Sequence, residues 1–389
     1  MQLDAAQRVV LAPDKFKGTV SARHLVGVMA AAIAELSPTT VVSALPVADG
    51  GDGSVEAALS AGWRADTVPA SDAWGDELVA TVARLDDRAI VEVASICGLG
   101  SRQPTPDQAA SATTRGVGRA VAVLLDQGVR EITLALGGSV TTDGGAGLLE
   151  ALGCELCDSA GQPLAPGGAA LGTLARVRTT GLHPGLRDLR LVLAGDVDTP
   201  MVGPDGSAEM FARQKGADDD LIARLSAGLA HAAPLLEDAF GARGAALRPG
   251  SGAAGGLAWA GLLLGGQLRS GAGVFLDLLD AADTIRGADL VITGEGRLDA
   301  QSLRGKAPVS VARLAGAFGV PTVAIVGSNR LPLESTGTAP FAEVIALDRI
   351  DPACARDSGL TCRLVGQATR TLVEATLDLS TNTENGARP

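Results

Sequence analysis

A chain of 389 residues is long enough for two domains, and its 46% hydrophobic and 20% charged residues exclude a disordered protein. The net charge of −12 argues against nucleic acid and anionic membranes as partners. In so acidic a protein, an anionic substrate requires a local pocket of cations. Five cysteines, an odd number, and the lack of a long apolar run in Met1–Val10 predict free thiols and a cytoplasmic protein.

The N-terminal 70 residues alternate between predicted strands and helices. Apolar runs at 8–12 and 40–47 predict buried strands. Between them, apolar residues spaced by three or four predict a helix that ends near Leu36 and has Ser21 as its N-cap. Another helix is predicted to begin at Ser54. This β-α-β-α order is typical of a parallel sheet with crossover helices.

Residues 64–95 depart from this order, because short β-rich segments follow one another without long helices between them. We therefore predict a boundary near residue 70. The second domain is expected to contain helices near 113–127 and 218–233 and strands at 131–136 and 189–194. After about residue 285, the alternation returns with strands at 289–293, 321–326 and 343–347 and helices at 300–318 and 363–377.

The simplest fold class is α/β, with two α/β domains. One is a discontinuous Rossmann-like domain, residues 1–70 plus 285–378, and the other is an inserted α/β domain, residues 71–284. The polar residues 379–389 are expected to form a flexible tail.

Several glycine-rich loops carry carboxylates, lysines or hydroxyls, and most of them follow a predicted strand. In open parallel sheets, ligands bind beyond the carboxyl ends of the strands. Glycine lets backbone N–H groups approach an anion, carboxylates can hold Mg²⁺, and lysine can neutralise phosphate. These are the parts of a phosphoryl-transfer site, although a structural turn stays open for each loop. The loops are 12–18, 46–54, 136–147, 194–200 and 293–299, followed by Gly305-Lys306.

Other chemistries find less support. The segment Gly250–Gly255 matches G-x-G-x-x-G, but no clear strand precedes it, so an anion-binding loop at a helix start is favoured over a dinucleotide site. Gly305-Lys306 is followed by Ala307, which excludes the P-loop motif of many kinases. The three histidines form no cluster, and no G-x-S-x-G motif occurs.

At these loops the chain resembles the bacterial glycerate kinase family, of the type distinct from the larger glycerate kinases with a different fold. The resemblance runs from about Val9 to about residue 377 and implies phosphorylation of glycerate with ATP and Mg²⁺, typically giving 2-phosphoglycerate. It also implies two α/β domains with the site in the cleft between them. The motifs that carry it are Ala-Pro-Asp-Lys-Phe-Lys-Gly (12–18), Pro-Val-Ala-Asp-Gly-Gly-Asp-Gly (46–53), Gly-Gly-Ser-Val-Thr-Thr-Asp-Gly-Gly-Ala-Gly (137–147), Gly-Ala-Ala-Gly-Gly (252–256) and Ile-Thr-Gly-Glu-Gly-Arg-Leu-Asp (292–299).

The chain departs from the family pattern beside two of these loops. Thr142 stands where the family often has Asn, and Gly195 stands where it often has Cys. Because the acids and glycines remain, these differences bear on substrate preference more than on the reaction. The alternative function is a non-catalytic sensor of phosphorylated metabolites. A sensor has no use for acids that bind Mg²⁺ or accept a proton, so the loop aspartates favour the kinase.

The catalytic base is predicted from the residue types available. With no histidine cluster and no tyrosine, a carboxylate is the available proton acceptor. Asp196 is chosen because it follows an apolar strand and is flanked by Gly195. Asp143 is its rival, and a purely structural turn is the third interpretation.

The other site residues are predicted by their charge and place in the loops. Lys17 is expected to act as a catalytic cation, and Asp49 and Glu295, with Asp52 in reserve, to hold Mg²⁺. The expected partners are therefore glycerate and ATP, with ATP and Mg²⁺ as cofactors, and a homodimer stays open. Substrate or nucleotide is expected to bind at Asp14, Lys15, Gly137, Gly138, Ser139, Asp143, Gly252, Gly255, Thr293, Gly294, Arg297 and Lys306.

Overall fold

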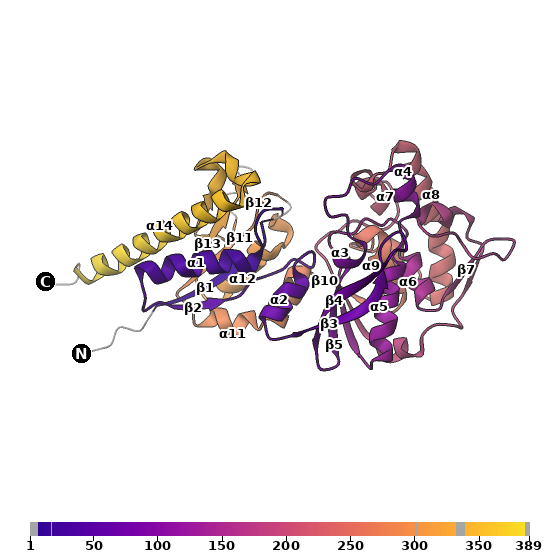
Figure 1. Ribbon diagram of the computed structural model, residues 1–389, viewed down its shortest axis with the longest axis horizontal. Helices are drawn as coiled ribbons and strands as arrows, with labels where there is room; N and C mark the ends of the chain where they lie inside the picture. The colour runs from indigo at the N-terminus through magenta and orange to yellow at the C-terminus, as the bar shows by residue number, and fades with distance from the viewer. Residues whose placement is uncertain (1–6, 17, 301, 332–338, 386–389) are drawn as a thin grey trace. The chain divides into compact units, whose positions relative to one another are not determined.

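The computed structural model describes residues 7–16, 18–300, 302–331 and 339–385. These residues group into two compact units (Figure 1). Unit 1 comprises the chain up to Ala48 and from Phe275 onward, and unit 2 is Asp49–Val274. Both units combine helices with a mostly parallel sheet, which agrees with the α/β fold class that the sequence predicted.

The sequence placed the changes between domains near residues 70 and 285, whereas the two units change at residues 48 and 275. The difference arises from strand pairing. Strand β3 (Arg64–Ser71) pairs along its whole length with β4 (Glu77–Leu85) in an antiparallel ladder. This ladder makes β3 the outer strand of the unit 2 sheet, so the residues that lead into it group with unit 2.

Unit 1 is built on a five-stranded sheet in the order β15-β13-β11-β1-β2, and every neighbouring pair is parallel. Counted within the unit, this is the doubly wound order 2-1-3-4-5, whose topological switch point lies between its first and third strands. Here those strands are β1 and β11. The sheet strands are β1 (Arg8–Pro13), β2 (Val41–Ala44), β11 (Leu290–Gly294), β13 (Thr322–Val326) and β15 (Glu343–Ala346), and a small pair is formed by β12 (Arg297–Leu298) and β14 (Ser328–Asn329).

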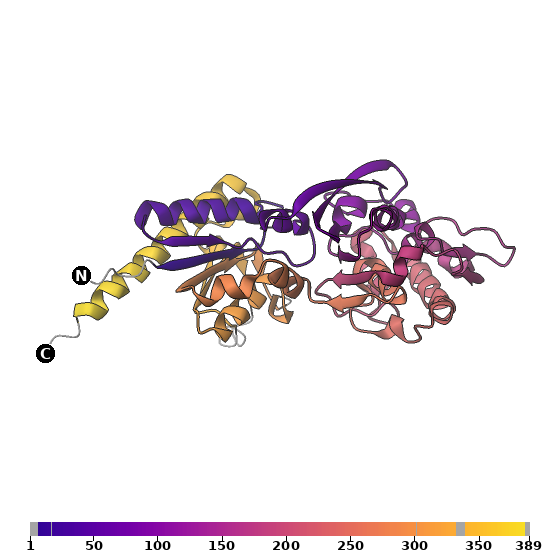
Figure 2. The ribbon, with the colours of Figure 1, turned by 90° about the horizontal axis from the view of Figure 1, so that it is seen from below.

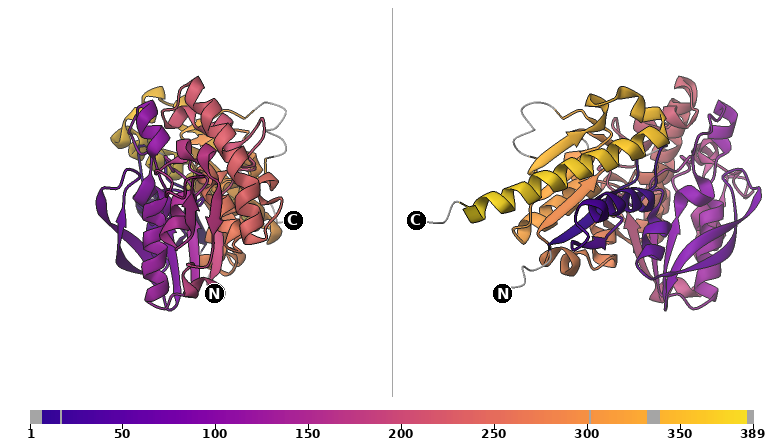
Figure 3. Two further views of the ribbon diagram at one scale, coloured as in Figure 1. Left: turned by 90° about the vertical axis from the view of Figure 1, so that its right-hand side faces the viewer. Right: turned by 60° about the vertical axis from the view of Figure 1, so that its left-hand side comes forward.

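Helices cover both faces of the unit 1 sheet, because its strands are apolar on both sides. Helix α1 lies on one face and the orange helices α11 and α12 lie on the other (Figure 2). Helix α14 packs along α1, as the right-hand view of Figure 3 shows. The core here includes Leu11, Met29, Ile292 and Val365. The helix bounds are α1 (Ala22–Leu36), α10 (Gly271–Leu278), α11 (Ala281–Arg286), α12 (Ala307–Ala317) and α14 (Ser358–Asn385).

Helix α14 extends further than the sequence predicted. Its backbone is helical to Asn385, whereas a flexible tail was expected from residue 379. No proline or glycine stands between Gln367 and Asn385, so nothing in this stretch breaks the helix. Residues 386–389 of the predicted tail lie outside the described ranges.

Unit 2 contains a six-stranded sheet in the order β10-β9-β6-β5-β4-β3. The four strands from β10 to β5 are parallel, and β4 and β3 continue the sheet in antiparallel fashion. The carboxyl ends of β6, β9 and β10 therefore lie at one edge. The further strands are β5 (Arg88–Glu92), β6 (Glu131–Ala135), β9 (Arg190–Ala194), β10 (Gln267–Arg269) and the separate pair β7 (Glu155–Cys157) and β8 (Arg176–Arg178).

The helices of unit 2 follow their apolar patterns. Helix α5 buries Val117, Val121 and Leu124, and it packs against β3 and α6. All residues of α9 are buried, which identifies it as a central helix. Asp218 caps α8 by accepting the Leu221 N–H at 2.9 Å. The helix bounds are α2 (Ser54–Ser60), α3 (Val93–Cys97), α4 (Pro106–Ser111), α5 (Arg115–Asp126), α6 (Ala146–Ala151), α7 (Ser207–Phe211), α8 (Asp219–Phe240) and α9 (Leu257–Leu263).

Candidate functional site

Three loops near the carboxyl ends of the parallel strands of unit 2 carry predicted site residues. Gly137, Gly138 and Ser139 follow β6, and Asp196 follows β9. The segment Asp49–Asp52 packs onto this edge, where the Gly137 N–H donates to the Gly50 carbonyl oxygen at 2.9 Å. The structure thus brings together three of the predicted loops within one unit.

Glycine is required where these loops meet. A β carbon on Gly271, which follows β10, would lie 2.0 Å from the Asp49 carbonyl oxygen. On Gly137 it would lie 2.6 Å from the Gly51 α carbon, and on Gly50 it would lie 2.8 Å from the Ala194 carbonyl oxygen. Only glycine avoids these backbone clashes, and the close approach holds the carboxylates of Asp49 and Asp196 near each other.

Asp196 is a half-buried carboxylate at the start of α10. It accepts the Gly271 N–H at 2.8 Å and the Ala272 N–H at 3.4 Å, and it hydrogen-bonds the Ser270 hydroxyl. Burial and, to a smaller extent, the charge of Asp49 raise the pKa of Asp196 to about 6, against the lowering effect of the hydrogen bonds. A carboxylate of this kind is ionised at neutral pH and can accept a proton there.

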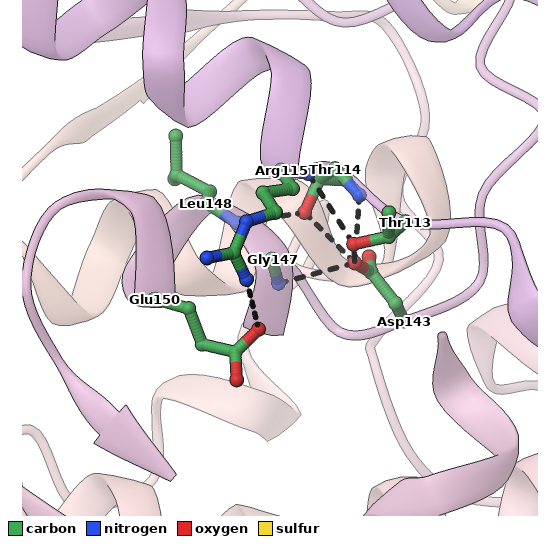
Figure 4. A network of polar contacts seen from close by, with 7 residues as sticks. All are labelled: Thr113, Thr114, Arg115, Asp143, Gly147, Leu148 and Glu150. Carbon is green, nitrogen blue, oxygen red and sulfur yellow. Dashed lines mark hydrogen bonds and ion pairs between the residues drawn. The ribbon is translucent and has the colours of Figure 1, made fainter. Parts of the chain in front are cut away.

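Asp143, the predicted rival of Asp196, is 1% exposed and is surrounded by the chain's own donors (Figure 4). Its carboxylate accepts hydrogen bonds from the Thr113 hydroxyl, from both the N–H and the hydroxyl of Thr114, and from the N–H groups of Gly145 and Gly147. The distances run from 2.8 to 3.3 Å. In this structure Asp143 fixes the loop between β6 and α6 to the start of α5.

Sequence reasoning missed Lys215, which lies beside the same loop. Lys215 is 5% exposed, and its Nζ donates to the Thr141 carbonyl oxygen at 2.6 Å. Burial lowers the pKa of this lysine to about 8, while Asp143 acts in the opposite direction. The sequence around Lys215 does not predict its burial, because its neighbours Arg213 and Gln214 are polar and exposed. A Lys-Gly pair at 215–216 is the signal that the sequence offered.

The loop 252–256 lies against the loop that contains Asp143. The Gly144 N–H donates to the Gly255 carbonyl oxygen at 2.9 Å. A β carbon on Gly255 would lie 1.9 Å from the Thr141 carbonyl oxygen, and on Gly252 it would lie 2.3 Å from that of Pro200. These two predicted binding residues therefore serve close backbone packing here, and their role in binding a ligand stays a prediction.

Unit 1 carries the other predicted residues at its topological switch point. The Asp14 N–H after β1 donates to the Gly294 carbonyl oxygen at 2.8 Å, and the Thr293 hydroxyl donates to that of Ala12 at 2.7 Å. Thr293 and Gly294 thus join the two central strands. Open sheets of this order bind ligands beside the carboxyl ends of these strands.

The lysines near this switch point are paired with buried carboxylates. Lys15 Nζ lies 3.8 Å from Asp14 Oδ1, and Lys306 Nζ lies 3.8 Å from Glu295 Oε2. Lys306 also stands immediately before α12, where the helix dipole adds positive potential. Arg297 is largely exposed and pairs with Asp299 at 3.4 Å. Lys17, the predicted catalytic cation, lies outside the described residues.

The predicted metal ligands belong to different units. Asp49 and Asp52 lie in unit 2, and Glu295 lies in unit 1. Within the described ranges, no group of three or more His, Cys, Asp or Glu side chains is arranged to hold a metal ion. In the same ranges, no helix is long and apolar enough to cross a bilayer.

Comparison with known proteins identifies the family. The model of the glycerate kinase family matches residues 9–370. A glycerate kinase of Bacillus subtilis is 37% identical over 325 residues, which are 82% of this chain and 85% of the relative. The chain belongs to the glycerate kinase family. A glycerate 2-kinase of Escherichia coli is 36% identical over 329 residues, again 82% of this chain and 85% of the relative.

A solved structure supports the same assignment. A putative glycerate kinase 2 from Salmonella typhimurium has a TM-score of 0.80 and 31% identity to this family member, over 97% of this chain and 100% of that one. The family resemblance predicted from the loop motifs is therefore confirmed, and so are the α/β fold class and the assignment as an enzyme. The matched range includes every predicted site residue, and the individual roles stay predictions.

We predict that Asp143→Ala destabilises this glycerate kinase family member strongly. The substitution leaves five buried donors without their acceptor, which should cost about 3–5 kcal/mol in the free energy of unfolding. Urea denaturation measures this loss. Asp188→Ala removes an exposed carboxylate that pairs with Arg130 and should cost less than about 1 kcal/mol. Equal losses in the two variants would refute a structural role for Asp143.

A second prediction concerns the pH dependence of stability at Asp196. Its pKa is raised from 3.8 to about 6 in the folded state, so the folded state binds this proton more tightly than the unfolded state. The free energy of unfolding therefore falls as pH rises through this window, by up to about 3 kcal/mol. Asp196→Asn lacks the titration and should gain stability relative to the unsubstituted protein between about pH 4 and about pH 7.5. Urea unfolding in metal-free buffer measures the difference, and a pH-independent difference would contradict the raised pKa.

Proposed function

We propose that the protein transfers the γ-phosphoryl group of ATP to a hydroxyl of glycerate, giving ADP and phosphoglycerate, with 2-phosphoglycerate as the favoured product. Family membership supports the reaction, and the relative named a glycerate 2-kinase supports the position of transfer. The observation that carries the proposal is the Asp196 carboxylate at the carboxyl end of β9. A non-catalytic sensor would have no need for a proton acceptor at this place.

In the proposed reaction, Asp196 is the general base. The attacking hydroxyl must lose its proton, although phosphoryl transfer depends mainly on positioning and charge neutralisation. Asp196 is held by the Gly271 and Ala272 N–H groups and the Ser270 hydroxyl, and a carboxylate offers about four acceptor positions. One position therefore remains for the hydroxyl of glycerate, whose proton passes to a carboxylate oxygen of Asp196.

Mg²⁺ fits the acidic edge of unit 2. The charge of Asp49 raises the pKa of Asp196, so the Asp49 carboxylate lies close enough to disfavour the ionisation of Asp196. A divalent cation relieves such repulsion, and Mg²⁺ takes one or two carboxylates together with phosphate oxygens and waters. We assign Asp49, with Asp52 beside it, to hold the ion. The bound ion supplies charge neutralisation to the phosphates.

The cations for an anionic substrate come from the switch point of unit 1. Lys15 and Lys306 are fixed by Asp14 and Glu295, and Lys306 precedes a helix of eleven residues. Lysine near a helix N-terminus binds phosphate and carboxylate groups well. We propose that these lysines, with Arg297 and Lys17, bind the phosphates of ATP or the carboxylate of glycerate.

The proposed reaction is tested by coupled ADP release with D-glycerate and MgATP. We expect turnover that depends on both substrates and stops when EDTA removes the metal, because uncomplexed ATP lacks charge neutralisation. The phosphoglycerate formed is identified by NMR, which separates the 2- and 3-phospho isomers. Binding of ATP and glycerate without turnover would instead support the sensor, and full turnover in EDTA would exclude the role of Mg²⁺.

Asp196→Asn should reduce kcat by roughly 10²-fold or more, because the amide keeps the shape of the carboxylate but cannot accept the proton. The variant should bind glycerate with little change in KM. Asp205→Asn, which changes an exposed aspartate of the same unit, serves as the matched control and should keep its kcat. A folded Asp196→Asn enzyme with kcat within a few-fold of the unsubstituted enzyme would refute the assignment of Asp196 as the base.

A further inference from the structure

Lys215 places a positive charge in the interior of unit 2, whereas the lysines of the predicted loops belong to unit 1. Its side chain is 5% exposed, and it follows the short helix α7. Moving an ammonium ion out of water is costly unless hydrogen bonds and opposite charge compensate it. The hydrogen bonds and opposite charges around Lys215 therefore indicate whether its role is structural or is to bind a ligand.

The hydrogen bonds of Lys215 leave most of its donor capacity unused. An ammonium group has three N–H donors. Among the described residues, Nζ makes one hydrogen bond, to the Thr141 carbonyl oxygen at 2.6 Å. Two donors therefore have no acceptor from the described chain.

Opposite charge near Lys215 is also incomplete. Asp143 is close enough to favour the charged lysine, but its carboxylate already accepts five hydrogen bonds from its own loop and from the start of α5, and none from Lys215. The other neighbour, Cys97, has its pKa raised to about 12 by burial, so its thiol is neutral at physiological pH. Lys215 is thus close to one acid that is hydrogen-bonded elsewhere.

The loop that accepts the hydrogen bond of Lys215 carries two hydroxyl side chains. The Ser139 and Thr141 hydroxyls lie 2.7 Å apart, and the Thr141 N–H donates to Ser139 Oγ at 3.1 Å. Both residues belong to the glycine-rich loop at the carboxyl end of β6, the edge where parallel sheets bind ligands. Hydroxyls beside a lysine in a glycine-rich loop are suited to an oxyanion.

We propose that Lys215 binds an oxyanion of the substrates, a carboxylate or a phosphoryl group, together with Ser139 and Thr141. The two N–H donors that the described residues leave unused point to such a ligand, since an oxyanion supplies both the acceptors and the missing negative charge. This inference rests on the proposed function for the identity of the ligand, which is the carboxylate of glycerate or a phosphate of ATP. The test below separates these two sources.

Two variants separate the charge of Lys215 from its bond to the loop. Lys215→Met removes both the charge and the donor, whereas Lys215→Gln keeps an N–H donor for Thr141 and removes only the charge. Glu237→Gln is the matched control, because Glu237 is also a buried charged residue of unit 2, where it accepts the Gly244 and Ala246 N–H groups. Calorimetry measures Kd for D-glycerate, for inorganic phosphate and for glycerol, which has no carboxylate. Thermal unfolding without ligand shows that each variant folds.

We expect both Lys215 variants to raise Kd by about tenfold or more for one of the two anions, while Glu237→Gln leaves it unchanged. Loss of glycerate binding identifies the carboxylate as the ligand, and loss of phosphate binding identifies the phosphoryl group. Glycerol should bind the unsubstituted protein more weakly than glycerate if the carboxylate is the ligand. The inference is overturned if Lys215→Gln binds both anions with unchanged Kd, or if the unsubstituted protein binds neither anion.

The binding measurements, combined with the ADP-release assay, test this inference separately from the proposed reaction. A protein that binds either anion through Lys215 but shows no ADP release supports the oxyanion site and refutes the kinase. A protein that phosphorylates glycerate, with kcat and KM unchanged in Lys215→Gln, supports the kinase and refutes the oxyanion site. A structural role alone would lower the unfolding temperature of Lys215→Met while Lys215→Gln kept its affinity for both anions, and this result also refutes the proposal.

Discussion

The candidate site of unit 2 depends on how closely backbone can approach backbone at one edge of its sheet. A β carbon on Gly271 would stand 2.0 Å from the Asp49 carbonyl oxygen, a distance that no side chain can accept. The same constraint applies at Gly137 against Gly51. Because the main chains of these loops are in direct contact, with no side chain between them, the carboxylates of Asp49 and Asp196 lie near each other. The raised pKa of Asp196 is a direct consequence, since burial and the nearby charge of Asp49 both act on a group that the packing fixes.

The buried charges of unit 2 differ in how well the chain satisfies them. Asp143 and Glu237 accept five and two hydrogen bonds from the chain, and such carboxylates stabilise the loops that they join. Asp196 combines hydrogen bonds with a nearby like charge. Within the described part of the chain, Lys215 has one hydrogen bond and no carboxylate bonded to it. The chain's own hydrogen bonds therefore satisfy Asp143 and Glu237, whereas Asp196 and Lys215 keep the capacity to bind a ligand.

Much of the architecture was predictable because it depends on local patterns. Apolar runs identified the parallel strands, and the loops after them fell at the carboxyl edges where the structure has them. The boundary near residue 70 was harder to predict, because the sequence of an apolar segment does not show which strand it will pair with. The pairing of β3 with β4 depends on tertiary contacts. Lys215 and the pair Ser270-Gly271 escaped notice for a similar reason. Polar residues in a loop give no sign of burial until the chain around them is folded.

In a protein with a net negative charge, an anionic substrate must be bound by individual lysines whose local surroundings favour it. In unit 1, Lys15 and Lys306 each stand 3.8 Å from a carboxylate that is less than 10% exposed. Such a carboxylate fixes its lysine but also offsets part of its charge, so an arriving anion competes with Asp14 or Glu295 for the ammonium group. In unit 2, the acid nearest Lys215 is already hydrogen-bonded elsewhere, so the competition there is weaker. The strongest local attraction for an oxyanion in so negative a chain is therefore expected where a buried lysine is left without a carboxylate bonded to it.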